Sequence, residues 1–375
     1  MRVIFKLIAF ALLCSAFIPF NVNAENVGVG SISASSACLI DAEGGRVLYS
    51  KNAEKQLPMA STTKIMTAIL ALESGIPLDR VIKIPQNAVG VEGSSIYLRA
   101  GEEISFETLL YGLLLSSAND SAVAIAITVS GSVENFVALM NKKAQDLGLV
   151  NTHFTNPHGL YDKEHFTTAL DLARIMAYCI KNEIFVSISG CYKKIAQAGE
   201  DLTRVMINHN RLLRTYDGVI AGKTGFTKMS GRCLVTVAER EGLRLIAVTL
   251  NAPNDWQDHT NLYDFGFANY RRVKIDGFTV KIPVISGNAS EIEVKSSDFS
   301  LFLPKNSEEI TTEIKAPRFI FATIGKGEKV GEVVYKCNGR ILAKAPLLAC
   351  ETVEKVKYRF NIFTRIIDFI KGIFK

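Results

Sequence analysis

The residues best suited to do chemistry are Ser61 and Lys64, in the stretch Met59-Ala60-Ser61-Thr62-Thr63-Lys64. An apolar run with helical spacing follows, made of Ile65, Met66, Ile69, Leu70 and Leu72. Pro58 lies before this segment and Gly75 lies just after it. These features predict a helix with Ser61 in its first turn or at its N-cap. Residues three apart share one face of a helix, so Lys64 Nζ can approach Ser61 Oγ. The pair therefore predicts a serine nucleophile activated by a lysine that burial or nearby cations keep partly neutral.

Two further polar clusters contain the residue types that such a nucleophile needs as helpers. Ser117 and Asn119 stand between two apolar segments of helical period, which predicts an exposed turn between helices. Lys223-Thr224-Gly225 belongs to a strand-like segment with an edge-like character, and its glycine lets a substrate backbone approach closely. Together they offer a proton path, a substrate donor and a positive charge for an anion. Taken alone, each cluster is more typical of an ordinary turn or strand end, so the interpretation depends on their combination with Ser61 and Lys64.

The periodicity of the chain predicts the elements that position these motifs. A β-hairpin is expected from residues 33–41 and 46–49, and three antiparallel strands from residues 219–225, 233–238 and 243–250. Besides the Ser61 helix, helices are expected at residues 106–115, 122–129, 136–147, 169–181 and 264–270. Strand, helices and then strands indicate an α+β sandwich, an antiparallel sheet flanked by helices, whose first and last segments are neighbours. We assign residues 25–272 to this domain.

The two ends of the chain and residues 273–352 differ from this domain. Residues 1–24 place basic residues, an apolar run and small residues in the order of a secretory signal peptide. Residues 273–352 hold short β-rich segments separated by glycine turns, which indicate a small all-β domain. Residues 353–375 have, from Tyr358 onward, one broad apolar and aromatic face and one basic face, with too many charges for a membrane-spanning helix. We expect an amphipathic helix on a membrane surface, with a helix docked on the β domain as the alternative.

Composition narrows the possible functions. The 375 residues are 48% apolar and 21% charged, which is typical of a globular protein with a large core. The net charge of +6 comes largely from the signal and from residues 353–375, so the body is near neutral and no nucleic-acid-binding face is expected. His153, His158 and His165 lack the spacing of a zinc site, and neither a metal nor a cofactor is predicted.

The cysteines show no metal-ligand spacing. Six remain once the signal is removed, namely Cys38, Cys179, Cys191, Cys233, Cys337 and Cys350. In an exported protein Cys337 and Cys350 are the first pair to consider for a disulfide, and buried free thiols are the open alternative.

The three motifs, Ser-x-x-Lys, Ser-x-Asn and Lys-Thr-Gly in this order, resemble those of the penicillin-recognising serine enzymes. The likeness is to the low-molecular-mass penicillin-binding proteins that act as D-alanyl-D-alanine carboxypeptidases. It spans about residues 33–270 and includes residues 60–68, 93–95, 98–102, 113–120, 156–160 and 222–227. Beyond residue 270 the β-rich region and the C-terminal segment are similar in architecture rather than in motif.

This resemblance implies a serine-type D-Ala-D-Ala carboxypeptidase that removes the terminal D-alanine from peptidoglycan stem pentapeptides, in cell wall synthesis or remodelling. It also implies covalent inhibition by β-lactams and a place at the outer face of the cytoplasmic membrane or in the wall. Ser61 would form the acyl-enzyme, Lys64 would be its general base, and Ser117 would pass the proton to the departing D-alanine.

The resemblance also implies a set of binding residues. Asn119 would bind the substrate peptide and help place Lys64, and Lys223 would supply positive charge beside Ser117. The terminal carboxylate would meet Thr224 and Thr227, next to Gly225, and the backbone N–H groups of Ser61 and Phe226 would form the oxyanion hole.

One segment departs from the pattern of the family. Several relatives place an arginine, which assists carboxylate binding, between the strand after Lys-Thr-Gly and the last helix of the domain. Residues 251–259 contain none here, so Lys223 and the threonines, or another group, must bind the carboxylate. His259 is a weak candidate, since an isolated histidine is more often a surface or capping residue.

Three alternative functions compete with that of a carboxypeptidase. A class A β-lactamase needs a glutamate for the deacylating water, and no Glu-x-x-Leu-Asn segment lies between Asn119 and Lys223, so a long-lived penicilloyl adduct is expected. A catalytically silent binding protein is disfavoured because every catalytic residue type is present. A DD-endopeptidase would use the same residues and stays open.

Overall fold

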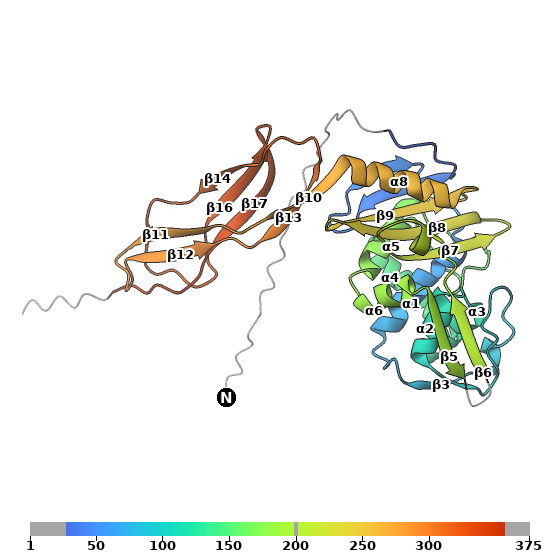
Figure 1. The fold of residues 1–375 in the computed structure, drawn as a ribbon. Helices are drawn as coiled ribbons and strands as arrows, with labels where there is room; N and C mark the ends of the chain where they lie inside the picture. Colours follow the sequence, from blue (N-terminus) through green and yellow to red (C-terminus); the bar gives the residue numbers. More distant parts are fainter. Residues whose placement is uncertain (1–27, 199–201, 357–375) are drawn as a thin grey trace, which may run out of the picture. The chain divides into compact units, whose positions relative to one another are not determined.

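The computed structural model describes residues 28–198 and 202–356 (Figure 1). The predicted signal peptide and residues 357–375 of the predicted membrane helix lie outside the described residues. The chain divides into two compact units, of which one spans Glu25–Arg272 and the other contains Val273–Lys375. Each unit is described by itself below.

The larger unit is organised around a five-stranded antiparallel sheet with the order β2-β1-β9-β8-β7. The first strand of the unit pairs with its last, since Ser36 lies opposite Leu250, as the sequence predicts. β7, which carries Lys-Thr-Gly, is an edge strand, also as expected. The strands are β1 (Ser36–Asp41), β2 (Val47–Lys51), β7 (Val219–Thr227), β8 (Gly231–Arg240) and β9 (Leu243–Leu250).

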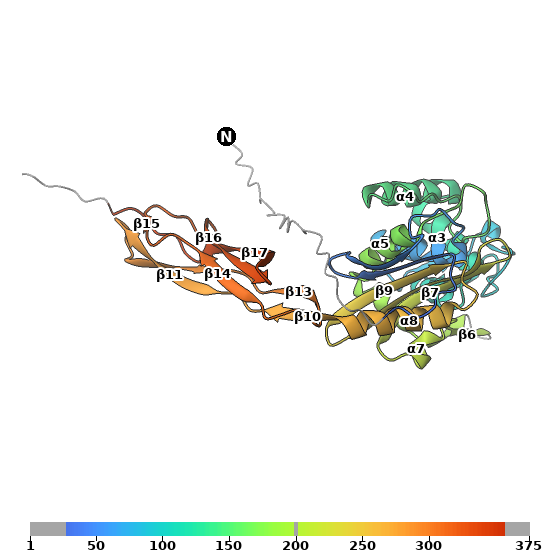
Figure 2. The same ribbon diagram turned by 90° about the horizontal axis from the view of Figure 1, so that it is seen from above.

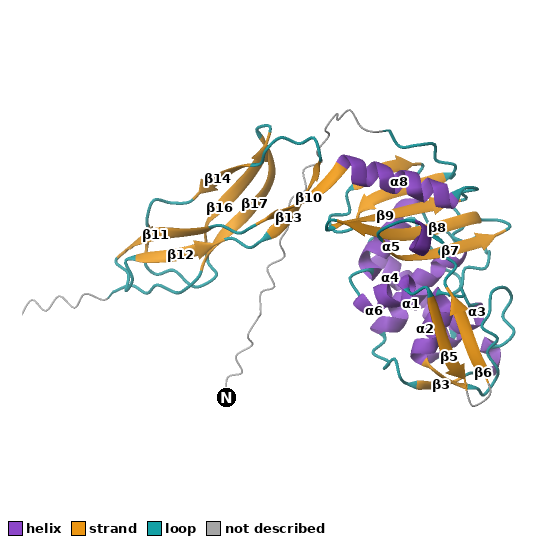
Figure 3. Ribbon diagram, viewed as in Figure 1, coloured by secondary structure: helices purple, strands orange, loops and turns teal. Residues whose placement is uncertain are grey.

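Helices cover both faces of this sheet (Figures 2 and 3). α8 packs on β8 and β9 from one side, and α5 packs on β9 and β1 from the other. β8 and β9 are therefore buried on both faces, which explains their nearly continuous runs of Val, Leu, Ile and Ala. The helices of this unit are the 3₁₀ turn η1 (Ala60–Thr63), α1 (Lys64–Glu73), the 3₁₀ turn η2 (Gln86–Ala88), α2 (Phe106–Leu114), α3 (Asn119–Ser130), α4 (Val133–Asp146), α5 (Ala169–Cys179), α6 (Glu183–Gly190), α7 (Leu212–Thr215) and α8 (Asp255–Asn269).

Within the described residues, the test for length and apolar character finds no single helix that could cross a membrane. α3 and α4 pass that test only as a pair, and they are bent by 85° at their junction.

α8 begins at Asp255, nine residues earlier than its apolar pattern suggests. Its first turns are polar but buried, because tertiary hydrogen bonds satisfy their side chains. Asp258, for example, accepts hydrogen bonds from the backbone N–H groups of Ser33 and Ala34, at 2.7 and 2.9 Å. Hydropathy alone could not reveal helical turns whose buried residues are polar.

The sequence interpretation also missed α6 and a hairpin made of β5 (Lys193–Ala198) and β6 (Leu202–Ile207). In this hairpin the apolar side chains of Ile195 and Val205 are exposed, whereas the charged side chain of Arg204 is buried. Two short strands, β3 (Val81–Lys83) and β4 (Glu103–Ser105), form another pair.

The smaller unit is all β, as predicted. Its six-stranded sheet has the order β14-β16-β17-β12-β11-β15, and β10 pairs separately with β13. Inward residues such as Ile292, Val294 and Leu347 form the core. The strands are β10 (Tyr270–Ile275), β11 (Thr279–Ile285), β12 (Glu291–Lys295), β13 (Phe299–Pro304), β14 (Thr311–Lys315), β15 (Ile320–Phe321), β16 (Lys329–Cys337) and β17 (Arg340–Ala349).

Of the two alternatives that the sequence leaves open for Cys337 and Cys350, the structure has free thiols, and all six cysteines of the described residues are free. Cys337 lies opposite Arg340 at the first end of β17, whereas Cys350 follows Ala349 at the other end. A ten-residue strand spans roughly 30 Å, far beyond the reach of a disulfide. The proximity of two cysteines in sequence was misleading because an extended strand separates them.

The β sheet also extends past residue 352, where the sequence suggested a boundary. Val353 is buried and pairs with Ile324, and the Val356 N–H donates to Ser286 O at 2.9 Å. The described chain therefore remains part of this unit up to Val356.

Candidate active site

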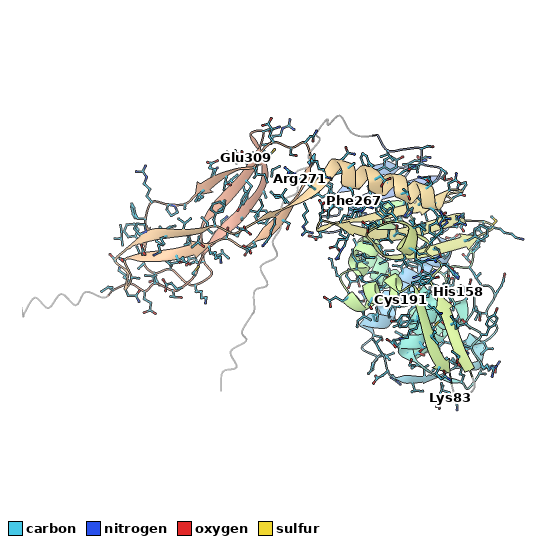
Figure 4. All side chains as sticks on the ribbon, in the orientation of Figure 1. Lys83, His158, Cys191, Phe267, Arg271 and Glu309 are labelled. Atoms are coloured by element: carbon cyan, nitrogen blue, oxygen red, sulfur yellow. The ribbon has the colours of Figure 1, made fainter. Side chains whose placement is uncertain are left out.

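Ser61 and Lys64 meet at the junction of η1 and α1. Lys64 is the first residue of α1, and its Nζ lies 3.0 Å from Ser61 Oγ, one turn earlier. The same nitrogen donates to Asn119 Oδ1 and to the His158 carbonyl, both at 2.7 Å (His158 is labelled in Figure 4). Lys64 is fully buried, and this burial, followed by the nearby charge of Lys223, lowers its pKa well below the ordinary value. The lowered pKa favours the neutral form of Lys64, which is the form that a general base requires.

The hydrogen bonds of Lys64 also orient its lone pair. Asn119 Oδ1 and the His158 carbonyl can only accept hydrogen bonds. A neutral amine has two N–H groups, and these two acceptors take both of them. The remaining lone pair then faces Ser61 Oγ, so the site is built to accept the proton of this hydroxyl.

Ser117 and Lys223 form the second pair. Lys223 Nζ donates to Ser117 Oγ at 3.0 Å and to Thr224 O at 2.9 Å. Burial alone lowers the pKa of Lys223 to about 7. A lysine poised near neutrality beside a serine hydroxyl can either exchange a proton through it or present charge to an anion.

The expectation that Ser117 and Asn119 lie in an exposed turn is wrong, since only 5% and 4% of their surfaces are exposed. Residues 92–98 cover the turn. The Asn119 N–H donates to Ser94 O at 2.7 Å, and its side-chain amide donates to Glu92 O at 2.5 Å. Asp120 ties down the same loop by accepting hydrogen bonds from the Ser95 hydroxyl at 2.6 Å and the Leu98 N–H at 3.0 Å. The turn consequently has a fixed shape.

Arg204 of the unpredicted hairpin supports this loop from behind. Its guanidinium forms a buried, two-armed ion pair with Glu102. It also donates to Ile96 O at 2.8 Å and to Tyr97 O at 3.0 Å. No sequence pattern indicated this role, because the partners are about a hundred residues apart and the hairpin itself was not foreseen.

β7 approaches the nucleophile so closely that only glycine fits at position 225. A Cβ on Gly225 would lie 2.9 Å from the backbone N of Ser61 and 3.1 Å from Ala60 Cβ. Phe226 follows on the same edge strand with its ring exposed. Thr227 makes its hydroxyl contact with Ser230 Oγ at 2.8 Å, in the turn that leaves β7. Thr224 is thus left as the β7 threonine whose hydroxyl no described contact occupies.

The turn that carries Ser61 is strained at Ala60, whose φ is +46°. Gly159 packs directly against it, because a Cβ at this position would lie 1.9 Å from Ala60 O, and its own φ is +90°. Thr63 Oγ1 donates to the same carbonyl at 2.7 Å, and His165 Nε2 lies 2.7 Å from Thr63 Oγ1. The loop of residues 155–165 therefore holds the nucleophile turn in place, a role that the sequence did not indicate for Thr63 or His165.

His259 does not belong to this site. It belongs to α8 and is fully buried against β8 and β9, with Nδ1 2.6 Å from Thr236 Oγ1 and Nε2 3.1 Å from Thr249 Oγ1. Burial lowers its pKa to about 3, so the ring is a neutral part of the core. It cannot replace the missing arginine as a cationic partner of a carboxylate.

The structure thus brings Ser61, Lys64, Ser117, Asn119 and Lys223 together from four separate elements. A serine beside an oriented lysine of lowered pKa, a second serine–lysine pair and a tightly apposed edge strand are the components of acyl transfer through a covalent intermediate. In the described part of the chain, no group of three His, Cys, Asp or Glu side chains could hold a metal ion.

Comparison with known proteins gives matches over most of the described chain. The profile of a family described as D-alanyl-D-alanine carboxypeptidase matches residues 21–254, and that of the penicillin-binding protein 5 C-terminal domain matches residues 270–355. The D-alanyl-D-alanine carboxypeptidase DacF of Bacillus subtilis is 36% identical over 338 residues, which cover 87% of each chain. DacC of Escherichia coli, also named a D-alanyl-D-alanine carboxypeptidase, is 31% identical and covers 92% of this chain and 90% of its own. A D-alanyl-D-alanine endopeptidase of Pseudomonas aeruginosa is 34% identical but covers 58% of this chain and 71% of its own.

A solved structure supports the same relationship. Penicillin binding protein 5 from Haemophilus influenzae superimposes with a TM-score of 0.74 at 29% identity, covering 88% of this chain and 100% of that one. The fold class predicted from the sequence, an α+β sandwich followed by a small all-β domain, is confirmed.

Proposed function

Because the chain belongs to the D-alanyl-D-alanine carboxypeptidase family, we propose that it removes the terminal D-alanine from peptidoglycan stem pentapeptides through an acyl-enzyme on Ser61. The observation that carries the proposal is the hydrogen bonding of Lys64. Two acceptors occupy the N–H groups of its neutral form and leave its lone pair for the Ser61 hydroxyl. This arrangement suits a general base and has no evident structural purpose, since burying a lysine is costly.

Acylation follows from this geometry. Lys64 takes the Ser61 proton while Oγ attacks the carbonyl carbon of the penultimate D-alanine, forming the C–O bond. The N–H groups of Ser61 and Phe226 stabilise the oxyanion, and the proximity of Gly225 to Ser61 supports a narrow slot there. When the C–N bond breaks, Ser117 gives its proton to the leaving amine and is reprotonated from Lys64 or Lys223.

Deacylation completes the cycle. Water attacks the ester carbonyl while a neutral lysine of the site takes the water proton. The ester C–O bond then breaks, and the lysine proton passes to Ser61 Oγ, which leaves as the hydroxyl. The products are D-alanine and the shortened stem peptide, and the enzyme returns to its starting protonation state.

Binding of the terminal carboxylate is assigned to Lys223 and Thr224. Lys223 supplies the charge, and Thr224 has a hydroxyl on the same edge strand. Thr227 is a second candidate, although its hydroxyl already contacts Ser230. Asn119 accepts a hydrogen bond from Lys64, and we assign it the binding of the substrate amide as well.

A β-lactam would react with the same serine and stay attached. The β-lactamase alternative lacks support because the relatives are named peptidases and the glutamate motif is missing from the sequence. The endopeptidase alternative has weaker support than the carboxypeptidase, since the relative with that name covers a smaller share of the chain.

We place the enzyme outside the cytoplasmic membrane. The N-terminal sequence supports export, and the amphipathic C-terminal sequence supports peripheral attachment to the outer face of the membrane. A chain ending at Val356, which keeps the whole β sheet, should stay active but sediment far less with anionic vesicles than the full chain. Equal sedimentation of the two chains would contradict this attachment.

The activity is tested with a synthetic peptide that ends in D-alanyl-D-alanine and with a cross-linked peptide dimer, followed by mass spectrometry. Loss of one D-alanine from the linear peptide is expected, and Ser61→Ala should abolish this loss together with covalent labelling by penicillin. Cleavage of the dimer alone would favour the endopeptidase, and labelling of the Ser61→Ala variant would mean that another serine is the nucleophile.

A further inference from the structure

An exposed apolar cluster lies at one end of the β unit, where β11 and β15 run side by side. It consists of Ile285, Phe319 and Phe321, whose exposed fractions are 41%, 48% and 64%. Ile285 is the parallel register partner of Phe321. The two phenylalanine rings meet edge to face, with centroids 5.6 Å apart. The three side chains therefore form one surface, which we call the aromatic tip.

The core of the unit does not require these residues. Val284 and Ile320, their strand neighbours, point inward and are buried, so the alternation of the strands turns the aromatic tip outward. Earlier along β11 the outward position of Lys281 is polar, and this lysine pairs with Glu291. Exposed aromatic groups that gather in one place usually mark a contact surface.

The described chain ends beside this tip. Val356 donates its N–H to Ser286 O at 2.9 Å, directly after Ile285, and Lys355 bridges to Gly287. Figure 2 shows β15 at the end of the unit where the coloured ribbon stops. The residues that follow, 357–375, are those whose sequence has a broad apolar face and a basic face. The residues that lead into the proposed membrane-binding segment, Lys355 and Val356, therefore lie next to the aromatic tip.

We propose that the aromatic tip is a second membrane-contact surface, which enters the headgroup region of an anionic lipid bilayer beside the C-terminal segment. The inference rests on the peripheral attachment proposed above. Phenylalanine side chains are stabilised at this depth by removal of their apolar surface from water. Two exposed basic residues, Arg318 and Lys355, adjoin the tip and favour anionic headgroups, although Glu354 is also exposed there.

Charge argues for a bilayer rather than for the chain's own C-terminal segment as the occupant. That segment is basic, and Arg318 and Lys355 would face its like charges if it folded back on the tip. If the segment docked in this way, its apolar face would be buried against the protein, and little apolar surface would remain to contact lipid. Both basic surfaces are instead complementary to the same anionic membrane.

The test measures partition of the full-length protein onto vesicles of phosphatidylglycerol and phosphatidylethanolamine. The variant Phe319→Ser/Phe321→Ser should bind about tenfold more weakly, from the apolar area lost, while its activity on a soluble peptide is unchanged. Ile314→Ser is the matched control, because Ile314 is an exposed residue on the opposite edge strand β14 and should leave binding unchanged. Equal binding by the double variant and the wild type overturns the inference.

A fluorescent probe separates the possible occupants. In Phe321→Trp, lipids with brominated acyl chains should quench the fluorescence of the new tryptophan. The parent protein, whose fluorescence comes from Trp256, is the control and should not be quenched. A tryptophan at position 321 that is already shielded from iodide in the vesicle-free full chain, but not in the chain ending at Val356, overturns the inference in favour of the C-terminal segment. If the full-length protein ignores vesicles altogether, the proposed peripheral attachment fails as well. Binding that is unaffected by Phe319→Ser/Phe321→Ser overturns the aromatic tip alone.

Discussion

His165 Nε2 lies 2.7 Å from Thr63 Oγ1, and this contact links a loop a hundred residues away to the nucleophile turn. The Thr155 N–H donates to His165 Nδ1 at 3.0 Å, so the proton of the neutral ring sits on Nε2 and is donated to Thr63. Thr63 in turn donates to the carbonyl of strained Ala60, next to Ser61. Burial lowers the pKa of His165 to about 4, which keeps the ring neutral at ordinary pH.

From this contact we expect His165→Ala and Thr63→Val to slow acylation of Ser61 by about 10- to 100-fold, because a nucleophile displaced by about 1 Å loses this much. Stopped-flow labelling with penicillin measures the rate. Thr63→Ser keeps the hydroxyl and should retain most of the wild-type acylation rate. The double variant should be no slower than the worse single variant, since both changes break one chain of contacts.

His153→Ala is the matched control for this prediction. His153 belongs to the same loop region but is exposed, and its ring contacts Glu164 O rather than the nucleophile turn. Its loss should leave the acylation rate unchanged. Multiplying losses in the double variant, or an equal loss in His153→Ala, would show that His165 only stabilises its loop.

Lys223→Ala should weaken cleavage of peptides with a free terminal carboxylate more than cleavage of their amidated analogues. A charge-assisted hydrogen bond contributes about 1.5–3 kcal/mol, so we expect a difference of about 10- to 100-fold in kcat/KM. Steady-state kinetics on matched peptide pairs provide the measurement. Equal losses on both substrates would assign Lys223 to proton transfer through Ser117 instead.

The lowered pKa of Lys223 also predicts a pH dependence of stability. Its pKa is about 7 in the folded protein and 10.5 in the unfolded chain, so between these values the unfolded state binds the extra proton. The free energy of unfolding should therefore rise with pH in this window, by up to about 1.4 kcal/mol per pH unit. Urea unfolding at several pH values should show a shallower rise for Lys223→Met. An unchanged slope would mean that Lys223 stays charged when folded.

Arg204→Met should destabilise the catalytic unit by about 3–5 kcal/mol, because it leaves the largely buried carboxylate of Glu102 without its partner. Urea denaturation of the two proteins provides the comparison. Lys142→Ala is the control, since its ion pair with Asp146 is exposed and contributes at most about 1 kcal/mol. A cost for Arg204→Met no larger than that of the control would show that the loop of residues 92–98 does not depend on this ion pair.

Local spacing was sufficient for part of this picture. Ser61 and Lys64 are one helical turn apart, so the contact between them follows from helix geometry once the helix is identified. The strands β7, β8 and β9 were likewise predictable, because short turns join consecutive antiparallel strands. The order of the three motifs along the chain also indicated the family, because this order can be read from the sequence without knowing how far apart the motifs lie in space.

Other features depend on contacts between distant segments, and the sequence was misleading or silent about them. Ser117 and Asn119 looked like an exposed turn because their burial comes from residues 92–98 folding over them. Cys337 and Cys350 are close in sequence and therefore suggested a disulfide. They are far apart in the structure because the extended strand β17 separates them.

By itself, then, the sequence determined which side chains are present at the site and which lie within one helical turn or one hairpin of each other. Only the tertiary structure decided that Lys64 is deprived of water and held between Asn119 and His158, and that His165 supports the Ser61 turn. The physical reason is that the pKa of a lysine and the strain at Ala60 are set by burial and by hydrogen-bond partners 55 to 102 residues away. Chain periodicity reports the local backbone, and carries no information on which distant oxygen will face a given nitrogen.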